Sequence, residues 1–205
     1  MHPVTATLLA GVLSTTLGCA SWKRFAYEGW GRDRWQQPDR VLEAIGVHDG
    51  ERVADVGAGG GYFTFRLAKA VGSTGVVYAV DVDPDMIDYL RTRARDDGFR
   101  NVEVVAAPTD APGLPPQSID LLFMSNTYHH IEDPVAYFRN ARRCLRDGGR
   151  VAILDLNDSG WFAWLFGHNT SAEKLRADMA QAGYRVAAEH SFVPEQTFIV
   201  FVPVA

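Results

Sequence analysis

The chain has 205 residues, of which 47% are hydrophobic and 22% are charged. These values are typical of a globular protein, so they exclude a disordered or fibrous chain and favour one α/β domain with short additions. Twenty basic and twenty-five acidic residues give a formal net charge of -5. A net negative charge provides no overall attraction to nucleic-acid phosphate, and we therefore expect no nucleic-acid partner.

The first residues, Met1–Trp22, form a compositionally separate segment because they contain no Lys, Arg, Asp or Glu. Within them, Val4–Leu17 is an apolar run that is too short to span a bilayer and has the length of a signal-peptide core. The run leads into Thr-Leu-Gly-Cys-Ala at residues 16–20, which resembles the lipobox of bacterial lipoproteins. The resemblance implies a leader over residues 1–21, a lipid on Cys19 and a membrane-associated protein of the bacterial cell envelope. The alternatives are an amphipathic or disordered leader and a cytoplasmic location.

Short apolar runs alternate with helical periodicity from residue 39 onward, which is typical of βαβ units and a mainly parallel sheet. These runs predict five strands, at Arg52–Val56, Val76–Asp81, Val102–Ala106, Ile119–Ser125 and Arg150–Asp155. Two further strands, Tyr184–Glu189 and Thr197–Val202, are joined by a short turn that contains proline. We therefore expect an α/β fold with a Rossmann-like seven-stranded sheet, mainly parallel, with a C-terminal antiparallel hairpin and helices on both faces.

Four helices are expected between these strands. They run from Tyr62 to Val71, from Pro84 to Gly98, from Asp133-Pro134 to Gly148-Gly149, and from a capping box at Thr170–Glu173 to Gly183. The third helix is expected to bury four apolar side chains, Val135, Phe138, Ala141 and Leu145. Cys144 falls in the same stretch, where we expect a buried and unreactive thiol.

A glycine-rich loop, Asp55–Gly61, falls between the first predicted strand and its helix. Glycine allows the backbone to turn sharply and to approach a ligand closely, and the free N–H groups at a helix start can bind an anion. A dinucleotide fingerprint requires Gly or Ala three residues after Gly59, but that position holds Tyr62. The spacing therefore disfavours NAD.

Asp81 ends the second predicted strand, where a carboxylate can accept hydrogen bonds from both hydroxyl groups of a ribose. The alternative is that Asp81 only caps the following turn. Asp83 is the better helix cap, because it directly precedes Pro84 at the first helical position.

Four segments together resemble the class I S-adenosylmethionine-dependent methyltransferases, and in particular the small-molecule group that includes quinone-biosynthesis enzymes. The segments are Asp55–Gly61, Ala79–Met86, Ile119–Leu121 and Leu145–Arg150. The resemblance implies S-adenosylmethionine as cofactor, a methyltransferase domain over residues 51–205 and an N-terminal helical lid over residues 22–50. It also implies methyl transfer to a small acceptor molecule.

The resemblance further assigns roles to individual residues. It places Asp55, Gly57, Gly59 and Gly61 around the methionine part of the cofactor, Asp81 on its ribose and Val82 against its adenine. An acidic residue after the third strand would meet the adenine amino group. Counting forward along the chain places this position at Pro108, and counting back from Leu114 places it at Asp110. We expect Asp110. Asn126 would lie near the methionine part or the acceptor.

Candidate catalytic residues follow the fourth strand in the segment Tyr128-His129-His130. Methyl transfer needs mainly close and aligned reactants, and a base helps only where the acceptor carries a proton. Either histidine could act as this base near neutral pH. We expect His129, with Tyr128 beside it, whereas His130 is expected to pack under the next helix. Because adjacent histidines in an extended segment point in opposite directions, no metal site is expected.

Aromatic residues gather before the first strand and after the fifth. They are Trp22, Phe25, Tyr27, Trp30 and Trp35 on one side, and Trp161, Phe162, Trp164 and Phe166 on the other. Together with Tyr128 they would form an aromatic wall around an apolar or aromatic acceptor. The alternatives are that they pack the lid against the sheet or, together with Cys19, face a membrane.

The sequence is also compatible with two rival functions. One is a non-catalytic envelope lipoprotein that binds S-adenosylmethionine or S-adenosylhomocysteine. The other is an NAD-dependent oxidoreductase, which is supported only by the glycine loop and Asp81.

Overall fold

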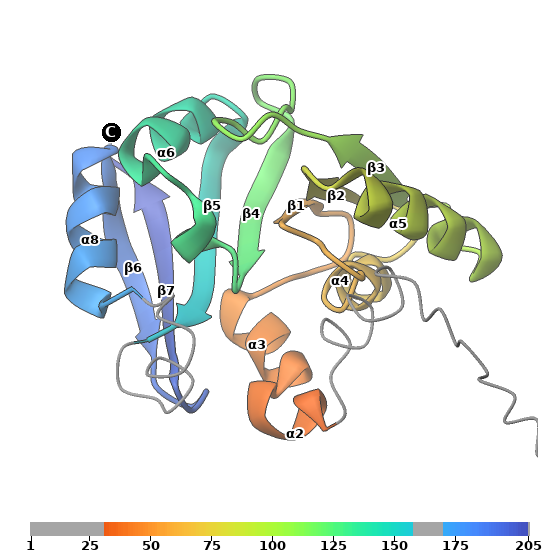
Figure 1. Ribbon diagram of the computed structural model, residues 1–205, viewed down its shortest axis with the longest axis horizontal. Helices are drawn as coiled ribbons and strands as arrows, with labels where there is room; N and C mark the ends of the chain where they lie inside the picture. Colours follow the sequence, from red (N-terminus) through yellow and green to blue (C-terminus); the bar gives the residue numbers. More distant parts are fainter. Residues whose placement is uncertain (1–30, 158–169, 205) are drawn as a thin grey trace, which may run out of the picture.

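The computed structural model describes residues 31–157 and 170–204. In this part of the chain the strands form one seven-stranded sheet in the order β3-β2-β1-β4-β5-β7-β6 (Figure 1). The strands are β1 (Arg52–Val56), β2 (Val76–Asp81), β3 (Val102–Ala106), β4 (Ile119–Ser125), β5 (Leu145–Leu156), β6 (Tyr184–His190) and β7 (Gln196–Pro203). Strand β7 is antiparallel to β5 and β6, whereas the pairs among β1–β5 are parallel. The predicted fold class is confirmed.

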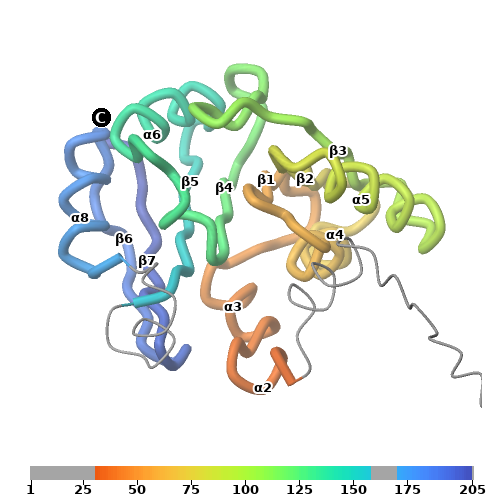
Figure 2. The backbone as a smooth tube through the Cα atoms, viewed as in Figure 1, coloured from red at the N-terminus to blue at the C-terminus, as the bar shows by residue number. Residues whose placement is uncertain are grey.

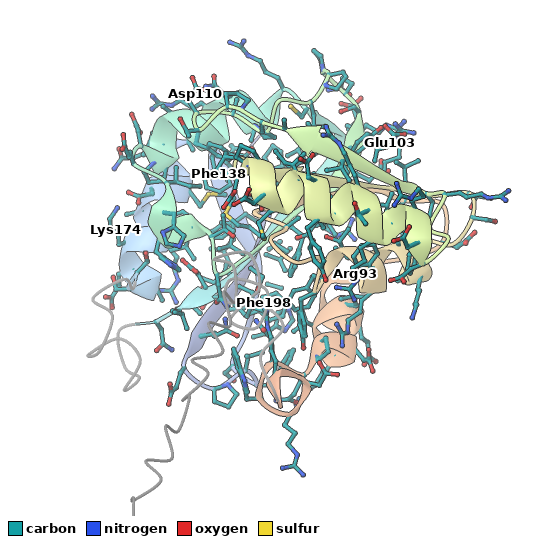
Figure 3. The ribbon with its side chains drawn as sticks, turned by 45° about the vertical axis from the view of Figure 1, so that its right-hand side comes forward. Arg93, Glu103, Asp110, Phe138, Lys174 and Phe198 are labelled. Atoms are coloured by element: carbon teal, nitrogen blue, oxygen red, sulfur yellow. The ribbon has the colours of Figure 1, made fainter. Side chains whose placement is uncertain are left out.

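Helices cover both faces of the sheet. They are α2 (Arg32–Gln36), α3 (Pro38–Ile45), α4 (Thr64–Ala70), α5 (Pro84–Asp96), α6 (Pro134–Arg142) and α8 (Ala172–Gln181), with a 3-10 turn, η1, at Tyr128–His130. Because successive side chains of a strand point to opposite faces, Val53 joins the core cluster formed with α3 and α4, and Ala54 joins the cluster formed with α6 and α8. Figure 3 labels one residue of each cluster, Phe198 and Phe138 respectively.

The carboxyl ends of the parallel strands meet at the edge of the sheet to which the β4 arrow points. Helices α2 and α3 lie at this end of the sheet (Figures 1 and 2). Helix α5 begins at the same edge, where the Asp83 side chain accepts a hydrogen bond from the Asp85 N–H and Pro84 occupies the first turn, as the sequence predicts. The fold therefore gathers the predicted functional segments at one edge.

The region between α6 and β5 differs from the prediction. Helix α6 ends at Arg142, and β5 begins at Leu145 and runs through Gly148 and Gly149 rather than starting at Arg150. The pairing register of β5 with β4 shifts here, so the two glycines occupy an irregular stretch of strand instead of ending a helix. Leu145 is buried as part of strand β5 and not as part of helix α6.

Three smaller differences concern helices. Val135 is only half-buried, because Tyr137 and Phe138 fill the core side of α6 instead. The N-cap of α8 is Ser171, whose hydroxyl accepts from the Lys174 N–H, one residue after the capping box predicted at Thr170. Helix α4 starts at Thr64 rather than Tyr62.

Cys144 lies between α6 and β5, where it is buried and its thiol donates to the Leu114 carbonyl oxygen at 3.3 Å, and burial raises its pKa. The expectation of a buried thiol is confirmed. Over residues 31–157 and 170–204, no helix combines the length and the apolar character needed to cross a bilayer.

Candidate functional site

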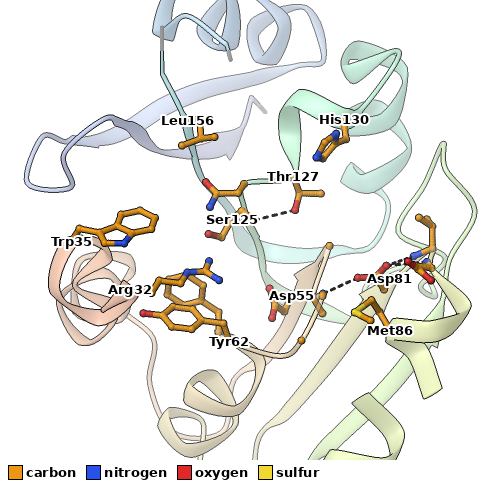
Figure 4. A pocket seen from close by; sticks show the side chains of 18 of the residues that line it. Arg32, Trp35, Asp55, Tyr62, Asp81, Met86, Ser125, Thr127, His130 and Leu156 are labelled. Carbon is orange, nitrogen blue, oxygen red and sulfur yellow. Dashed lines mark hydrogen bonds between the residues drawn. The ribbon is translucent and has the colours of Figure 1, made fainter. Parts of the chain in front are cut away.

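A cavity of about 930 Å³ opens at the carboxyl edge of the sheet (Figure 4). This volume suits a cofactor together with part of a second small molecule. One side of the lining comes from the segments that end β1 and β2: Asp55, Gly57, Ala58, Gly59, Gly60, Tyr62, Phe63, Asp81, Val82, Asp83 and Met86. The other side comes from α2, the segment after β4, the end of β5 and the β6–β7 turn: Arg32, Trp35, Ser125, Asn126, Thr127, His130, Leu156, Pro194 and Glu195.

The glycine loop leaves no space for side chains at two of its positions. Gly57 has a φ of +72°, and a Cβ atom there would lie 2.2 Å from the Thr127 hydroxyl oxygen. Gly61 has a φ of +82°, and its Cβ would lie 2.3 Å from the Phe65 ring. Gly57 therefore brings the loop against the segment after β4 at the cavity wall. Gly61 lies outside the lining and instead permits close packing of the loop on α4.

Arg93 fixes the glycine loop from the side of α5. Its guanidinium donates a hydrogen bond of 2.8 Å to the Gly60 carbonyl oxygen and lies 4.5 Å from the centroid of the Phe65 ring (Figure 3). The loop is consequently held by a second helix in addition to the one that it starts. A preformed loop of this kind presents its backbone to a ligand without first having to become ordered.

Asp81 joins the ends of β2 and β1. One carboxylate oxygen accepts a 2.8 Å hydrogen bond from the Gly59 N–H, and the other accepts from the N–H groups of Val82 and Asp83 at 2.8 and 3.0 Å. Asp81 therefore holds the turn that follows β2 and also lines the cavity. Val82, beside it in the lining, is 56% exposed, which leaves an apolar surface available to a flat ligand.

Asp55 supplies a buried negative group at the base of the cavity. Burial is the main cause that raises its pKa, and the nearby Asp81 charge adds to it, whereas a 2.6 Å hydrogen bond from the Thr64 hydroxyl and the Arg32 charge oppose the shift; the resulting pKa is about 6. The carboxyl group can therefore change its charge near neutral pH, and a cation bound beside it would stabilise the charged form.

Arg32 brings a positive group to the same cavity from α2. Its guanidinium carbon lies 3.8 Å from the centroid of the Tyr62 ring, and burial lowers its pKa to about 10, so it remains a cation at neutral pH (Figure 4). Arg66 lies 4.2 Å from the same centroid, and the Tyr62 hydroxyl donates to Asp33 at 2.6 Å. These contacts dock α2 on the start of α4. The sequence gives no local signal that separates Arg32 from its neighbour Arg34.

The segment after β4 does not follow the predicted arrangement. Residues Tyr128–His130 form a 3-10 turn and not an extended segment, and the two histidine rings lie 4.1 Å apart. His130 lines the cavity, whereas His129 and Tyr128 lie outside the lining. The His129 ring is 2.8 Å from Asp155, and the buried Tyr128 hydroxyl donates to Asp178 at 2.6 Å.

The other predicted site residues lie as follows. Asn126 lines the cavity in a left-handed conformation with a φ of 52°, whereas Asp110 is exposed outside the lining and its carbonyl oxygen accepts from Asn140. Trp35 is 40% exposed and lines the cavity. The remaining residues of the expected aromatic wall, Trp22, Phe25, Tyr27, Trp30, Trp161, Phe162, Trp164 and Phe166, lie outside the described residues, as does Cys19. Within the described ranges no cluster of His, Cys, Asp and Glu has the arrangement of a metal site.

Similarity to known proteins supports the interpretation of this geometry. Residues 47–191 match the methyltransferase domain family. Aklanonic acid methyltransferase DauC from Streptomyces sp. (strain C5) is 37% identical over 114 residues, which cover 56% of this chain and 52% of that protein. A ubiquinone/menaquinone biosynthesis C-methyltransferase, UbiE from Shewanella sp. (strain W3-18-1), is 29% identical over 118 residues, 57% of this chain and 47% of that protein. The chain thus spans about half the length of the curated relatives that it matches.

A solved structure agrees over nearly the whole fold. A SAM-dependent methyltransferase from Aquifex aeolicus superposes with a TM-score of 0.83 at 26% sequence identity, covering 89% of this chain and 98% of that one. The family match covers the glycine loop, Asp81 and the segment after β4. The chain therefore belongs to the methyltransferase domain family, in the class of S-adenosylmethionine-dependent methyltransferases.

Proposed function

We propose that this protein transfers the methyl group of S-adenosylmethionine to a small apolar or aromatic acceptor. The observation that carries the proposal is the shared cavity, in which the glycine loop, the Asp81 carboxylate and the oppositely charged Arg32 and Asp55 face one volume of about 930 Å³. S-adenosylmethionine supplies a methyl group activated by a positively charged sulfur.

The charges of the cavity fit the methionine end of this cofactor. That end carries an ammonium and a carboxylate group, and the cavity offers the buried Asp55 to the former and Arg32 to the latter. The space next to Gly57 is already filled by Thr127, so only a bare backbone can pass at this point of the wall. These residues would hold and orient the cofactor.

The charge and exposure of the residues after β2 fit the adenosine end. Asp81 would accept hydrogen bonds from the ribose hydroxyl groups, and the exposed Val82 would lie against the adenine. Met86 adds apolar surface beside them. An adenine contact for Asp110, which the sequence predicts, would require the loop after β3 to bring Asp110 to the cavity on binding.

The acceptor side of the cavity is apolar around a few polar groups. Trp35, Leu156 and Pro194 supply its apolar surface, which suits a flat or hydrophobic acceptor. The names of two relatives, for aklanonic acid and for ubiquinone/menaquinone biosynthesis, support an acceptor of this kind. The expected base is His129, which Asp155 orients, although His130 and not His129 lines the cavity.

Binding and turnover can be tested separately. We expect calorimetry to detect S-adenosylhomocysteine binding to the purified protein and Asp81→Asn to weaken it by about 1.5–3 kcal/mol, the range for hydrogen bonds to a charged group. Asp88→Asn, on an exposed site of α5, is the matched control and should bind like the wild type. An unchanged dissociation constant for Asp81→Asn would mean that the ribose assignment is wrong.

A product assay with labelled methyl donor separates an enzyme from a binding protein. Incorporation of label into a small acceptor supports the enzyme. Tight S-adenosylhomocysteine binding without turnover on any acceptor would support the non-catalytic lipoprotein instead, and binding of NAD without affinity for S-adenosylmethionine would support the oxidoreductase.

We also propose that Cys19 attaches the chain to a membrane of the bacterial envelope. The support is the lipobox-like sequence at residues 16–20 and the positive bias of Trp22–Arg40, which has five basic and three acidic residues. Fractionation of cells should place the wild type in the membrane and Cys19→Ala in the soluble fraction. An identical distribution of both forms would remove the proposal.

A further inference from the structure

A chain of side-chain amides connects α2 to the segment after β4 across the cavity wall. Gln36 is fully buried in α2, and Gln196 is 5% exposed at the start of β7. The Gln36 amide nitrogen lies 3.2 Å from the Gln196 amide oxygen, and the Gln196 nitrogen lies 2.6 Å from the Asn126 amide oxygen. Buried amides are costly unless they are hydrogen-bonded, so these contacts fix three side chains from distant parts of the sequence.

The direction of this chain is set at one end by Arg32. A guanidinium can only donate hydrogen bonds, and Arg32 Nε donates to the Gln36 amide oxygen. Gln36 must therefore direct its NH2 group toward Gln196, which in turn directs its own NH2 group toward Asn126. The orientation of each amide thus follows from the one before it.

Asn126 is the last member of this chain of amides, and it lines the cavity. Its amide oxygen is occupied by Gln196, and within the described residues its amide nitrogen makes no hydrogen bond. The left-handed backbone of Asn126 turns the residue out of the strand direction. The group that Asn126 presents is therefore an NH2 donor.

Ser125 provides a second donor beside it. The Ser125 hydroxyl oxygen accepts a 3.2 Å hydrogen bond from the remaining N–H of Gln36, which leaves the hydroxyl hydrogen to point elsewhere. Both residues line the cavity directly before Thr127, whose side chain packs on Gly57 of the glycine loop. The two donors thus lie next to the loop proposed to hold the cofactor.

We infer that the methyl acceptor carries an oxygen with free electron pairs, as a carboxylate, an enolate, a phenolate or a carbonyl compound does, and that Ser125 and Asn126 receive this oxygen. The inference rests on the proposed function and narrows its substrate class. An ammonium group has only N–H donors, so it could not accept from the Asn126 NH2 group or from the Ser125 hydroxyl, and only the remaining lone pair of the Ser125 oxygen would be left to it. A carboxylate for an ammonium group on the same side of the lining is that of Glu195, in the β6–β7 turn.

The transfer step balances for such an acceptor. An electron pair of the acceptor forms the bond to the methyl carbon, while the bond between that carbon and sulfur breaks and its electron pair remains on sulfur. An acceptor that is already an anion loses no proton in this step, and its negative charge cancels the positive charge of the sulfonium. A carbonyl compound first loses an α-proton to the base, expected at His129, and reacts as the enolate. Two fixed donors at the oxygen then serve mainly to align the acceptor.

The test compares three probes that share one ring system, with S-adenosylhomocysteine bound to the protein. 1-Naphthoate and 1-acetylnaphthalene offer an acceptor oxygen, and 1-(aminomethyl)naphthalene offers only donors at neutral pH. Calorimetry should show that 1-naphthoate binds roughly 10- to 100-fold more tightly than the amine, the range for hydrogen bonds to a charged partner, and that 1-acetylnaphthalene binds roughly 2- to 10-fold more tightly, the range for a neutral acceptor. Equal or tighter binding of the amine would overturn the inference.

Gln196→Glu provides a sharper test, because it should reverse the orientation of the Asn126 amide while leaving Asn126 itself unmutated. A glutamate still accepts from Gln36 but turns an oxygen toward Asn126, so the Asn126 amide should rotate and present its own oxygen to the cavity. The preference for oxygen probes should then fall by the same factor. Gln117→Glu makes the same replacement in an exposed loop at the opposite edge of the sheet and should retain the wild-type preference.

Asn126→Asp gives a second variant in case Gln196→Glu does not fold. It still accepts from Gln196 and replaces the presented NH2 by an oxygen, so it should lose the same preference. Full retention of the preference in either folded variant would overturn the inference. S-adenosylhomocysteine binding without affinity for any oxygen probe would also overturn the inference and leave the proposed function standing. Failure to bind S-adenosylhomocysteine would refute the proposed function. In that case the probe preference of the cofactor-free protein would still decide the inference.

Discussion

Replacing Asp55 by asparagine is expected to stabilise the cofactor-free protein while weakening cofactor binding. Burial raises the pKa of Asp55 from 3.8 to about 6. A carboxyl group with a raised pKa in the folded state contributes stability that is complete below about pH 4 and is lost as the pH rises through about 6. The difference between the two pKa values corresponds to about 3 kcal/mol of unfolding free energy at neutral pH.

Urea denaturation of the cofactor-free protein between about pH 4 and 8 measures this contribution. The wild type should lose about 3 kcal/mol over this range relative to Asp55→Asn, because the amide carries no charge at either end of the range. The two proteins should be close in stability at the acid end, where the asparagine oxygen can still accept the hydrogen bond from Thr64. Asp88→Asn replaces a side chain that is 80% exposed and should follow the wild-type profile.

Parallel stability curves for the wild type and Asp55→Asn would refute this reasoning, because they would show that the Asp55 carboxyl group titrates alike in the folded and unfolded chains. Cofactor binding gives an independent measurement. Asp55→Asn removes the proposed negative partner of the cofactor ammonium, so S-adenosylhomocysteine should bind at least about tenfold more weakly. A gain in stability together with a loss of affinity would identify Asp55 as a residue retained for binding rather than for folding.

Three further predictions concern the loop, the thiol and the base. Gly57→Ala should cost about 2–5 kcal/mol of unfolding free energy, because the cost of a left-handed conformation and the cost of a collision with Thr127 add together. Gly98→Ala is the control: Gly98 has a φ of +76° and open space around its Cβ position, so this change should cost only about 1–2 kcal/mol. Equal costs for the two variants would exclude the collision. In a Cys19→Ala protein, Cys144 is the only thiol, and its raised pKa and burial predict slow reaction with a disulfide reagent at about pH 8 until urea unfolds the chain. His129→Ala should lower turnover more than S-adenosylhomocysteine affinity, and an equal loss of both would argue against a base.

The central strands could be predicted almost to the residue, because strands buried on both faces appear as continuous apolar runs between turn residues. The error at β5 has a physical cause. Gly148 and Gly149 are typical of a helix end, but an irregular strand pairing also accommodates glycine, and only the pairing partner Ile119 decides between the two. Tyr62 continued the helical periodicity of α4, yet it lies in the turn, where Arg32 and Arg66 contact its ring.

The residues of the site likewise fall into two groups: those that a local sequence pattern predicts and those that only the folded chain brings together. Gly57, Gly59 and Asp81 could be found from the sequence, because a glycine loop between a strand and a helix and an acidic residue at the next strand end are local patterns. Gln36 and Gln196 could not be found, because 160 positions separate them and only the folded sheet brings their amides together.

This division also bears on what relatives reveal about the acceptor. The family match begins at residue 47 and ends at residue 191, so it includes the glycine loop and Asp81 and excludes Arg32, Gln36 and Gln196. The excluded residues are those that set the orientation of Asn126 at the acceptor side of the cavity. The two proposed donors, Ser125 and Asn126, lie inside the match, whereas the residues that orient Asn126 lie outside it, so one fold can retain its methyl donor while the preference for the acceptor changes. We therefore expect α2 and β7 to contribute to the choice of acceptor, and the naphthalene probes test the contact between them.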